Sequence, residues 1–267
     1  MPPAVLTLDA QSGTGQRGPM FPIRDHNPSG RTPWITWALM AINIAVFLAT
    51  WPLLPSEEAA FVLFDAWGMV PGRISMGQDW QTILTSMFLH AGWMHIAGNM
   101  LFLWIFGDNM EDAFGHFGFL AFYLAAGLAA ALIQLGADPW SPIPMVGASG
   151  AIAGVLGGYL LMFPRARVDI LVIIIIFFRI FPVPAWIMLG LWFAFQLVGG
   201  FSAPSDEGGV AYWAHAGGFV AGVVMTVPLW LRRGGPAFWS RTHGLPPHPE
   251  AEYEIGPSRI PVVRRRR

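Results

Sequence analysis

The sequence predicts an all-α polytopic membrane protein, a bundle of six transmembrane helices, and three observations lead to this fold class. Of the 267 residues, 54% are hydrophobic and only 12% are charged, whereas soluble domains carry about 25% charged residues. The mean hydropathy is correspondingly high, at +0.51. Long apolar segments also recur along the chain between polar stretches, which is typical of membrane-spanning helices.

Six apolar segments define the expected helices, and polar tails flank them. The stretch 164–184 precedes the fifth helix, and its Pro182 and Pro184 predict an apolar loop or a short strand there. Residues 1–32 and 233–267 are expected to be flexible tails, the second one basic, around one domain at 33–232. The expected helices cover about residues 34–54, 82–106, 117–136, 149–163, 185–199 and 210–231.

The distribution of arginine predicts the orientation of the bundle. With an even number of spans both termini share a side, and this side holds all 15 basic residues except Arg73. The positive-inside rule therefore predicts a multi-pass integral membrane protein with both termini in the cytoplasm. If the source is a bacterium, the expected location is the inner membrane. The N-terminus lacks the basic and apolar regions of a cleavable signal peptide. The absence of cysteine excludes disulfides, zinc–thiolate sites and cysteine nucleophiles.

Polar side chains at membrane depth lie on the second, fourth and sixth segments, which run in the same direction. These side chains are His90, His95 and Asn99, then Ser149, then His215. A helix rises about 1.5 Å per residue, which places Ser149, His95 and His215 in one layer roughly 8–10 Å below the outer surface. Ionisable residues inside a membrane are costly and usually face a bundle interior or a water-filled cavity. The shared layer therefore predicts a functional site.

The residue types in this layer suit acyl transfer. A serine hydroxyl is a weak nucleophile until a base takes its proton, and histidine is the usual base, so Ser149 and His215 are the candidate pair. No acid lies suitably near His215 in the sequence, which predicts a dyad and not a triad. Gly147 and Gly150 would let the backbone and a substrate approach closely.

Acyl transfer also needs donors for the developing oxyanion. His95 and Asn99 are four residues apart, so they share one face of a helix, and both side chains can donate a hydrogen bond. The backbone N–H of Ser149, at a helix N-terminus, is a third candidate donor.

Structural roles compete with each of these interpretations. Ser149 alone could be a helix cap or a small packing residue, the glycines could serve helix packing, and His215 could join two helices. His90 and His95 are five apart and should diverge around a helix, which makes them a poor metal pair. We therefore expect no metal and no cofactor. An ion or proton transporter that uses the histidines is a further alternative.

Three motifs resemble those of one family. "HAGWMHIAGN" at 90–99, "GASG" at 147–150 and "AHAGGFVAG" at 214–222 resemble, in order, the signatures of rhomboid intramembrane serine proteases. The resemblance covers about residues 33–232 and implies a six-helix rhomboid-like bundle. Some members carry an aromatic residue that stacks on the histidine, where this chain has Ala153.

The resemblance also implies site residues. Ser149 would be the nucleophile and His215 the general base, while His95, Asn99 and the Ser149 amide would line the oxyanion hole. His90 would lie near the water-facing mouth. Two glycines would let the sixth helix approach the fourth; they are Gly218 and Gly222.

The function that follows is intramembrane serine endopeptidase activity. The implied partners are the lipid bilayer and transmembrane protein substrates with a locally unwound helix and a small residue before the scissile bond; no nucleic acid is expected. The alternative is a catalytically silent rhomboid-like factor that binds or dislocates membrane proteins.

Overall fold

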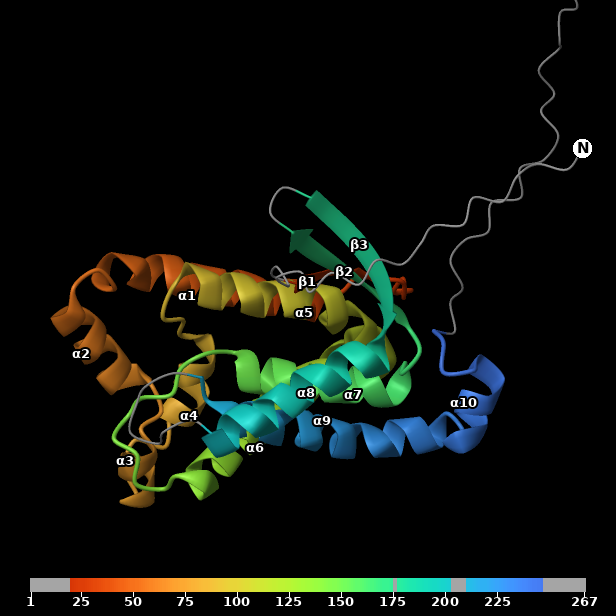
Figure 1. The fold of residues 1–267 in the computed structure, drawn as a ribbon. Helices are drawn as coiled ribbons and strands as arrows, with labels where there is room; N and C mark the ends of the chain where they lie inside the picture. Colours follow the sequence, from red (N-terminus) through yellow and green to blue (C-terminus); the bar gives the residue numbers. More distant parts are fainter. Residues whose placement is uncertain (1–19, 175–176, 203–209, 247–267) are drawn as a thin grey trace, which may run out of the picture.

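A computed structural model describes residues 20–174, 177–202 and 210–246, so the expectations for 1–19 and 247–267 lie outside the described residues. Helices dominate this part of the chain (Figure 1). The α-helices are α1 Trp34–Thr50, α2 Glu57–Trp67, α3 Pro71–Ser75, α4 Thr82–Thr85, α5 Trp93–Phe114, α6 His116–Ala137, α7 Ser149–Met162, α8 Ala185–Ser202, α9 Tyr212–Arg232 and α10 Pro236–Thr242. Two 3₁₀ turns, η1 Trp51–Leu53 and η2 Ser86–Phe88, and three strands, β1 Met20–Asp25, β2 Arg167–Ile174 and β3 Phe177–Pro184, complete the described elements.

The polytopic helical bundle is confirmed, and in the described residues four helices are long and apolar enough to cross a membrane. They are α1 extended to Leu53, α6, α8 and α9, with mean hydropathies of 1.5 to 1.9. Helix α7 is apolar but has only 14 residues. Helix α5 has 22 residues but carries Asp108, Glu111 and Asp112 near its end. That α5 and α7 also cross the membrane, which would give six membrane-spanning helices, stays a prediction.

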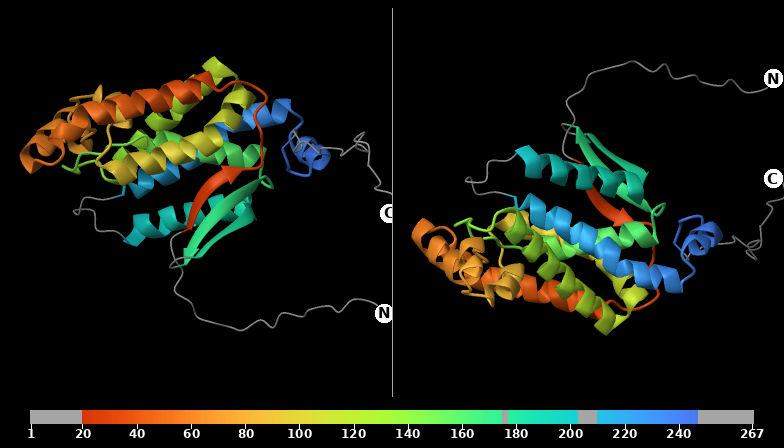
Figure 2. Two further views of the ribbon diagram at one scale, coloured as in Figure 1. Left: turned by 90° about the horizontal axis from the view of Figure 1, so that it is seen from above. Right: turned by 90° about the horizontal axis from the view of Figure 1, so that it is seen from below.

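Helix α7 forms the centre of the bundle. Most of its residues are buried, and it packs against α5, α6 and α9. Helices α5, α7 and α9 run in one direction, whereas α1, α6 and α8 run the opposite way (Figures 1 and 2). The parallel course of these three helices, expected from the sequence, brings their first turns to the same end of the bundle.

The helix expected at 82–106 is wrong at its start, because α5 begins only at Trp93. The preceding residues form α4, η2 and a turn in which Leu89 is extended, with φ −86° and ψ 146°. The carbonyl of Ser86 accepts a hydrogen bond from the N–H of Gly147, at 2.8 Å. This stretch is therefore tied to the loop before α7 and does not continue as a helix.

The expectation of an all-α chain missed a three-stranded antiparallel sheet in the order β1-β2-β3. Strands β2 and β3 occupy the stretch expected to be an apolar loop or a short strand. Strand β1, which lies in the predicted N-terminal tail, pairs with β2 from Met20 opposite Val172 to Asp25 opposite Val168. Helix α10 likewise lies in the predicted C-terminal tail. Pairing between segments so distant in sequence leaves no local pattern from which to predict it.

Both ends of the described chain lie at the end of the bundle where α7 finishes. The N–H of His26 donates to the carbonyl of Arg167 at 2.8 Å, and the N–H of Arg165 donates to the carbonyl of Gly244 at 2.9 Å. Arg73 lies at the other end, where it contacts the Asp65 carboxylate at 3.2 Å. For the described arginines, the separation expected from the sequence is thus present in the fold.

Candidate functional site

Ser149 and His215 meet at the contact between α7 and α9. Ser149 is the first residue of α7, and His215 lies in the first turn of α9. The Ser149 Oγ lies 2.7 Å from the His215 Nε2, which is hydrogen-bonding distance. The cap of α7 is Ala148, without a side-chain cap bond, so the Ser149 hydroxyl contacts the imidazole and does not cap the helix.

The glycines of α7 and α9 make this contact sterically feasible. A Cβ at Gly218 would overlap the carbonyl oxygen of Gly150, and a Cβ at Gly222 would overlap that of Gly154. A Cβ at Gly150 would in turn lie 2.6 Å from the Ala130 Cβ on α6. The two helices therefore touch through backbone atoms, and this close approach sets the separation of Ser149 and His215.

His95 lies beside Ser149, across Gly147. A Cβ at Gly147 would lie 2.7 Å from the His95 Nε2 and 3.6 Å from the Ser149 Oγ, and Gly147 has a φ of +125° that L side chains rarely adopt. The Nδ1 of His95 accepts a hydrogen bond from the N–H of Ala91, at 3.4 Å. The neutral ring therefore carries its proton on Nε2, the nitrogen that faces Gly147.

Asn99 follows His95 by one turn of α5. It is 7% exposed, and its side-chain nitrogen has no hydrogen-bond partner among the described residues. A buried amide donor without a partner is costly. A donor of the Asn99 amide is therefore unused within the part of the chain that the structure describes.

His90 takes a different position from the expected one. It precedes α5, and its ring centroid lies 5.0 Å from that of His95, so the two histidines do not diverge around a helix. It is also completely buried, at 0% exposure. The expected divergence of the two histidines is wrong because α5 starts after His90, whereas the position of His90 near a water-facing mouth stays a prediction. The described residues contain no group of three His, Asp or Glu that could hold a metal ion.

Comparison with known proteins decides the family. Residues 77–232 match the model of the Rhomboid domain. The chain belongs to the rhomboid family. The three motifs that carried the resemblance all lie within the matched range.

Several curated rhomboid proteins are similar to this chain. Rhomboid protein 1, mitochondrial, of Saccharomyces cerevisiae is 32% identical over 205 residues, which is 71% of this chain and 51% of that protein. Rhomboid protease GluP of Bacillus subtilis is 33% identical over 216 residues, 78% of this chain and 37% of that protein. Rhomboid protease AarA of Providencia stuartii is 34% identical over 137 residues, 45% of this chain and 48% of that protein. The chain thus spans about half or less of the length of these relatives. Membership of this family, together with the apolar helices, makes the chain an integral membrane protein.

Two residues of α8 that the sequence reasoning missed contact the histidine of this rhomboid domain. The Oε1 of Gln196 lies 2.8 Å from the His215 Nδ1. The Trp192 ring lies beside the imidazole, with centroids 5.9 Å apart and planes at 32°. Gln196 is the one polar side chain within 185–199. A polar residue in an apolar span was therefore the signal that could have found it.

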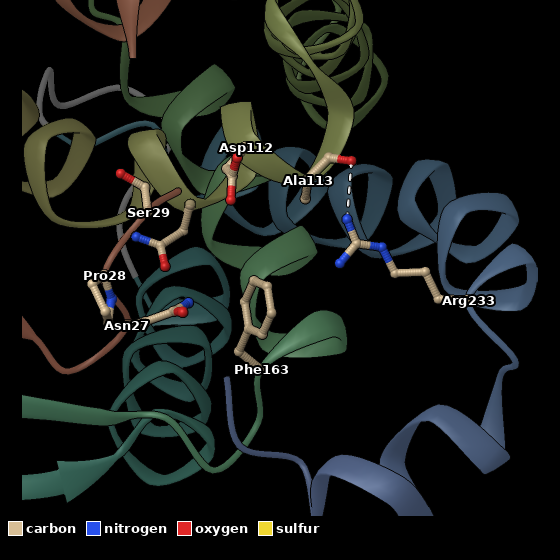
Figure 3. A pocket seen from close by; sticks show the side chains of 8 residues that line it. Asn27, Pro28, Ser29, Asp112, Ala113, Phe163 and Arg233 are labelled. Carbon is tan, nitrogen blue, oxygen red and sulfur yellow. Dashed lines mark hydrogen bonds between the residues drawn. The ribbon is translucent and has the colours of Figure 1, made fainter. Parts of the chain in front are cut away.

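A polar pocket lies at the opposite end of the rhomboid bundle (Figure 3). Helices α5, α7 and α9 carry the candidate site in their first turns and reach this pocket at their last. In the pocket Arg233 donates to the carbonyl of Ala113, at 3.3 Å. The pocket is therefore separate from Ser149. Its lining residues are Asn27, Pro28, Ser29, Asn109, Asp112, Ala113, Phe163 and Arg233.

Asp25, next to this polar end, couples β1 to α7. Its Oδ2 accepts a hydrogen bond from the Tyr159 hydroxyl, at 2.7 Å. Burial raises the pKa of the Asp25 carboxyl to about 7, the negative charge of Asp108 adds to the effect, and the hydrogen bond from Tyr159 opposes it. The docking of β1 thus involves a carboxyl group that is neutral in slightly acidic conditions.

Proposed function

We propose that the chain is a serine endopeptidase that cleaves transmembrane segments of membrane proteins within the lipid bilayer, by a Ser149–His215 dyad. The observation that carries the proposal is the distance of 2.7 Å between the Ser149 Oγ and the His215 Nε2. A serine hydroxyl that contacts the acceptor nitrogen of an imidazole is the arrangement that activates a serine nucleophile. Membership of a family that includes named proteases supports the same activity.

The reaction begins when the His215 Nε2 takes the proton from the Ser149 Oγ. The oxygen then attacks the carbonyl carbon of the scissile peptide bond and gives a tetrahedral oxyanion. His215 passes the proton to the leaving amine as the C–N bond breaks, which leaves an ester on Ser149. A water molecule, deprotonated by His215, attacks the carbonyl carbon of this ester. As the bond to the Ser149 Oγ breaks, His215 returns the proton to that oxygen, and the second product leaves as a carboxylic acid. These steps need neither a metal nor a cofactor.

The oxyanion is stabilised by donors on α5 and α7. The His95 Nε2 carries its proton toward Gly147, because its Nδ1 accepts from Ala91. The Asn99 amide is buried without a partner among the described residues. The Ser149 N–H, at the start of α7, is the third donor. Donors placed around a developing negative charge are usually a large source of rate enhancement in acyl transfer.

The proposed topology has six membrane crossings with both termini in the cytoplasm, in the inner membrane of a bacterium. Residues 33–232 form the protease domain, and 1–32 and 233–267 flank it. The described arginines at the end of the bundle where α7 finishes, with only Arg73 among them at the other end, support this orientation. The site then lies nearer the outer face, where the water needed for hydrolysis reaches it most directly.

The experiment that tests the proposal is cleavage of a model single-span substrate, with a small residue before the scissile bond, by the full-length protein in liposomes. We expect fragments from the wild type and none from Ser149→Ala. Ser240→Ala, an exposed serine on α10, is the matched control and should cleave normally. Substrate that binds to the wild type but stays intact would instead identify a catalytically silent binding or dislocation factor.

A further inference from the structure

We propose that Gln196 is a positioning residue for His215, which holds the imidazole in the tautomer that accepts the Ser149 proton. This inference rests on the proposed function, because it assigns a role within the same Ser149–His215 pair. The site is then not an isolated dyad but a chain of three hydrogen-bonded side chains on three helices. The members are Ser149 on α7, His215 on α9 and Gln196 on α8.

The hydrogen bonds of Gln196 determine which atom of its amide faces the histidine. Its Nε2 donates to the backbone carbonyl of Trp192, one turn earlier on α8, at 3.1 Å. A carbonyl oxygen can only accept, so the amide nitrogen must occupy this position. The amide oxygen is therefore the atom that lies 2.8 Å from the His215 Nδ1.

This orientation fixes the proton on His215. The Gln196 Oε1 can only accept, so the Nδ1 of a hydrogen-bonded His215 must carry the hydrogen. In the neutral ring the Nε2 is then a bare lone pair, and it faces the Ser149 Oγ at 2.7 Å. The other neutral tautomer would present an N–H to the hydroxyl and could not take its proton. The partner of one ring nitrogen thus sets the function of the other.

Burial and packing hold Gln196 in this position. The buried residues of α8 are Ala185, Leu189 and Gln196, and Gln196 is 8% exposed. A polar side chain buried in an apolar helix is costly unless it is hydrogen-bonded, so its bonds to Trp192 and His215 are its stabilisation. The Trp192 ring, 5.9 Å from the imidazole, covers the same histidine. Trp192 and Gln196 of α8 thus contact His215 in a chain that has Ala153 where some rhomboid members have an aromatic residue.

The orientation of the base consequently depends on α8. Most of α8 is not buried in the bundle, and Gln196 is where its buried face meets His215. If α8 moved away from α9, the Nδ1 would lose its acceptor and the tautomer would no longer be selected. The amide is neutral, so it orients the ring without the charge stabilisation that a carboxylate supplies in a triad.

The test compares three variants of the full-length protein in liposomes. Gln196→Met keeps a side chain of similar length but removes the acceptor, and Gln196→Glu keeps an acceptor oxygen. Phe195→Met is the matched control, because Phe195 is 68% exposed on the same helix. We expect Gln196→Met to lower kcat for a transmembrane substrate roughly tenfold with KM unchanged, because one buried hydrogen bond is lost. Phe195→Met should leave both constants unchanged.

Gln196→Glu tests the pH dependence of kcat/KM, which would not change if Gln196 only stabilised the fold. We expect it to restore most of the lost kcat and to shift the rising limb of kcat/KM against pH to higher pH, because a carboxylate favours the imidazolium form. His95, on α5, is a second titratable group close to His215 and is unchanged in this comparison. Equal kcat for wild type and Gln196→Met, or an unmoved pH profile in Gln196→Glu, would overturn the inference.

A spectroscopic measurement separates this inference from the proposed function. In ¹⁵N-histidine-labelled full-length protein, with His215 assigned by its loss in His215→Asn, we expect the proton of the neutral ring on Nδ1. In Gln196→Met we expect a mixture of tautomers, and in Phe195→Met the wild-type signal. This result does not depend on cleavage, so it tests Gln196 even if the chain proves catalytically silent or Gln196→Met cleaves poorly because it is unstable. A wild-type signal in a folded Gln196→Met would refute the role.

Discussion

Gly222 of α9 lies against the backbone carbonyl of Gly154 on α7, so closely that a methyl group on Gly222 would overlap the oxygen. Gly218 lies against Gly150 in the same way, one turn nearer the site. Interhelical contacts between small residues allow such close backbone approach in membranes. The contact of Ser149 with His215 therefore depends on glycines in the interface between the two helices.

The first prediction is that Gly222→Ala separates α7 from α9. The added methyl group would overlap backbone atoms of Gly154, which cannot move aside as a flexible side chain can. Overpacking of this kind typically destabilises a protein by about 1–3 kcal/mol. We expect a lower thermal midpoint in detergent and a strong loss of cleavage. Gly190→Ala on α8 is the control, because a Cβ there meets nothing within 4 Å. Equal stability and cleavage in the two variants would show that the close contact is dispensable.

The second prediction concerns reactivity. A serine-directed fluorophosphonate should label Ser149 alone among the hydroxyl residues, because the His215 Nε2 lies 2.7 Å from its Oγ. Mass spectrometry of the labelled protein locates the adduct. Labelling should disappear in Ser149→Ala and fall sharply in His215→Asn. An adduct that survives Ser149→Ala would assign the nucleophile elsewhere.

The third prediction concerns the oxyanion donors. His95→Ala and Asn99→Ala should each slow cleavage without unfolding the protein, since removal of one oxyanion donor costs typically about 10²–10³-fold in turnover. Three donors share the charge here, so each single effect should lie near or below the lower value. Circular dichroism and the thermal midpoint control for folding. An unchanged rate in the double variant would remove both side chains from the mechanism.

The spacing of apolar segments predicted most of the helical fold, because a membrane-spanning helix needs about 20 apolar residues and such a run is recognisable in the sequence. Helices α1, α6, α7, α8 and α9 begin within a few residues of their expected starts. The start of α5 was missed because residues 82–92 are apolar enough to continue the helix. In the structure a tertiary hydrogen bond from Gly147 to Ser86 ties this stretch to the loop before α7 instead. Strand β1 was missed because its partner β2 lies far away in the sequence.

The candidate site was predictable to the extent that its residues lie in recognisable motifs. Ser149 and His215 were paired from their residue types and shared depth, and the structure brings them into contact. Gln196 was missed because a lone glutamine carries no motif, although its polarity within an apolar span was visible. The contact between His90 and His95 was missed because it follows from the unexpected start of α5.

The fourth prediction is a pH dependence in the docking of β1. Burial raises the pKa of Asp25 to about 7, whereas an unfolded aspartate titrates near 3.8. Between these values the docked state binds more protons than the undocked one, so docking weakens as the pH rises toward 7 and levels off above it. Hydrogen exchange of residues 20–25 should therefore be faster at pH 8 than at pH 5.5, after correction for intrinsic rates.

Asp25→Asn should remove this dependence, because the amide stays neutral and can still accept from the Tyr159 hydroxyl. Asp138→Asn, in the loop before α7, serves as the control and should keep it. A dependence that persists in Asp25→Asn would point to another group at this end of the bundle.

The fifth prediction concerns the side of the membrane on which the site opens. Both ends of the described chain lie where α7 finishes, and Ser149, His95 and His215 lie in the first turns of their helices, at the other end. The arginines at the former end predict that it faces the cytoplasm. The site should therefore open toward the outer face, with the shorter path to water on that side.

Single cysteines test this topology without background, because the chain has none of its own. Gln78 and Ser240 are exposed and lie at opposite ends of the bundle, which makes them a suitable pair. In intact cells, a membrane-impermeant maleimide should label Gln78→Cys at once and Ser240→Cys only after permeabilisation. The reverse pattern would invert the orientation and place the opening of the site in the cytoplasm.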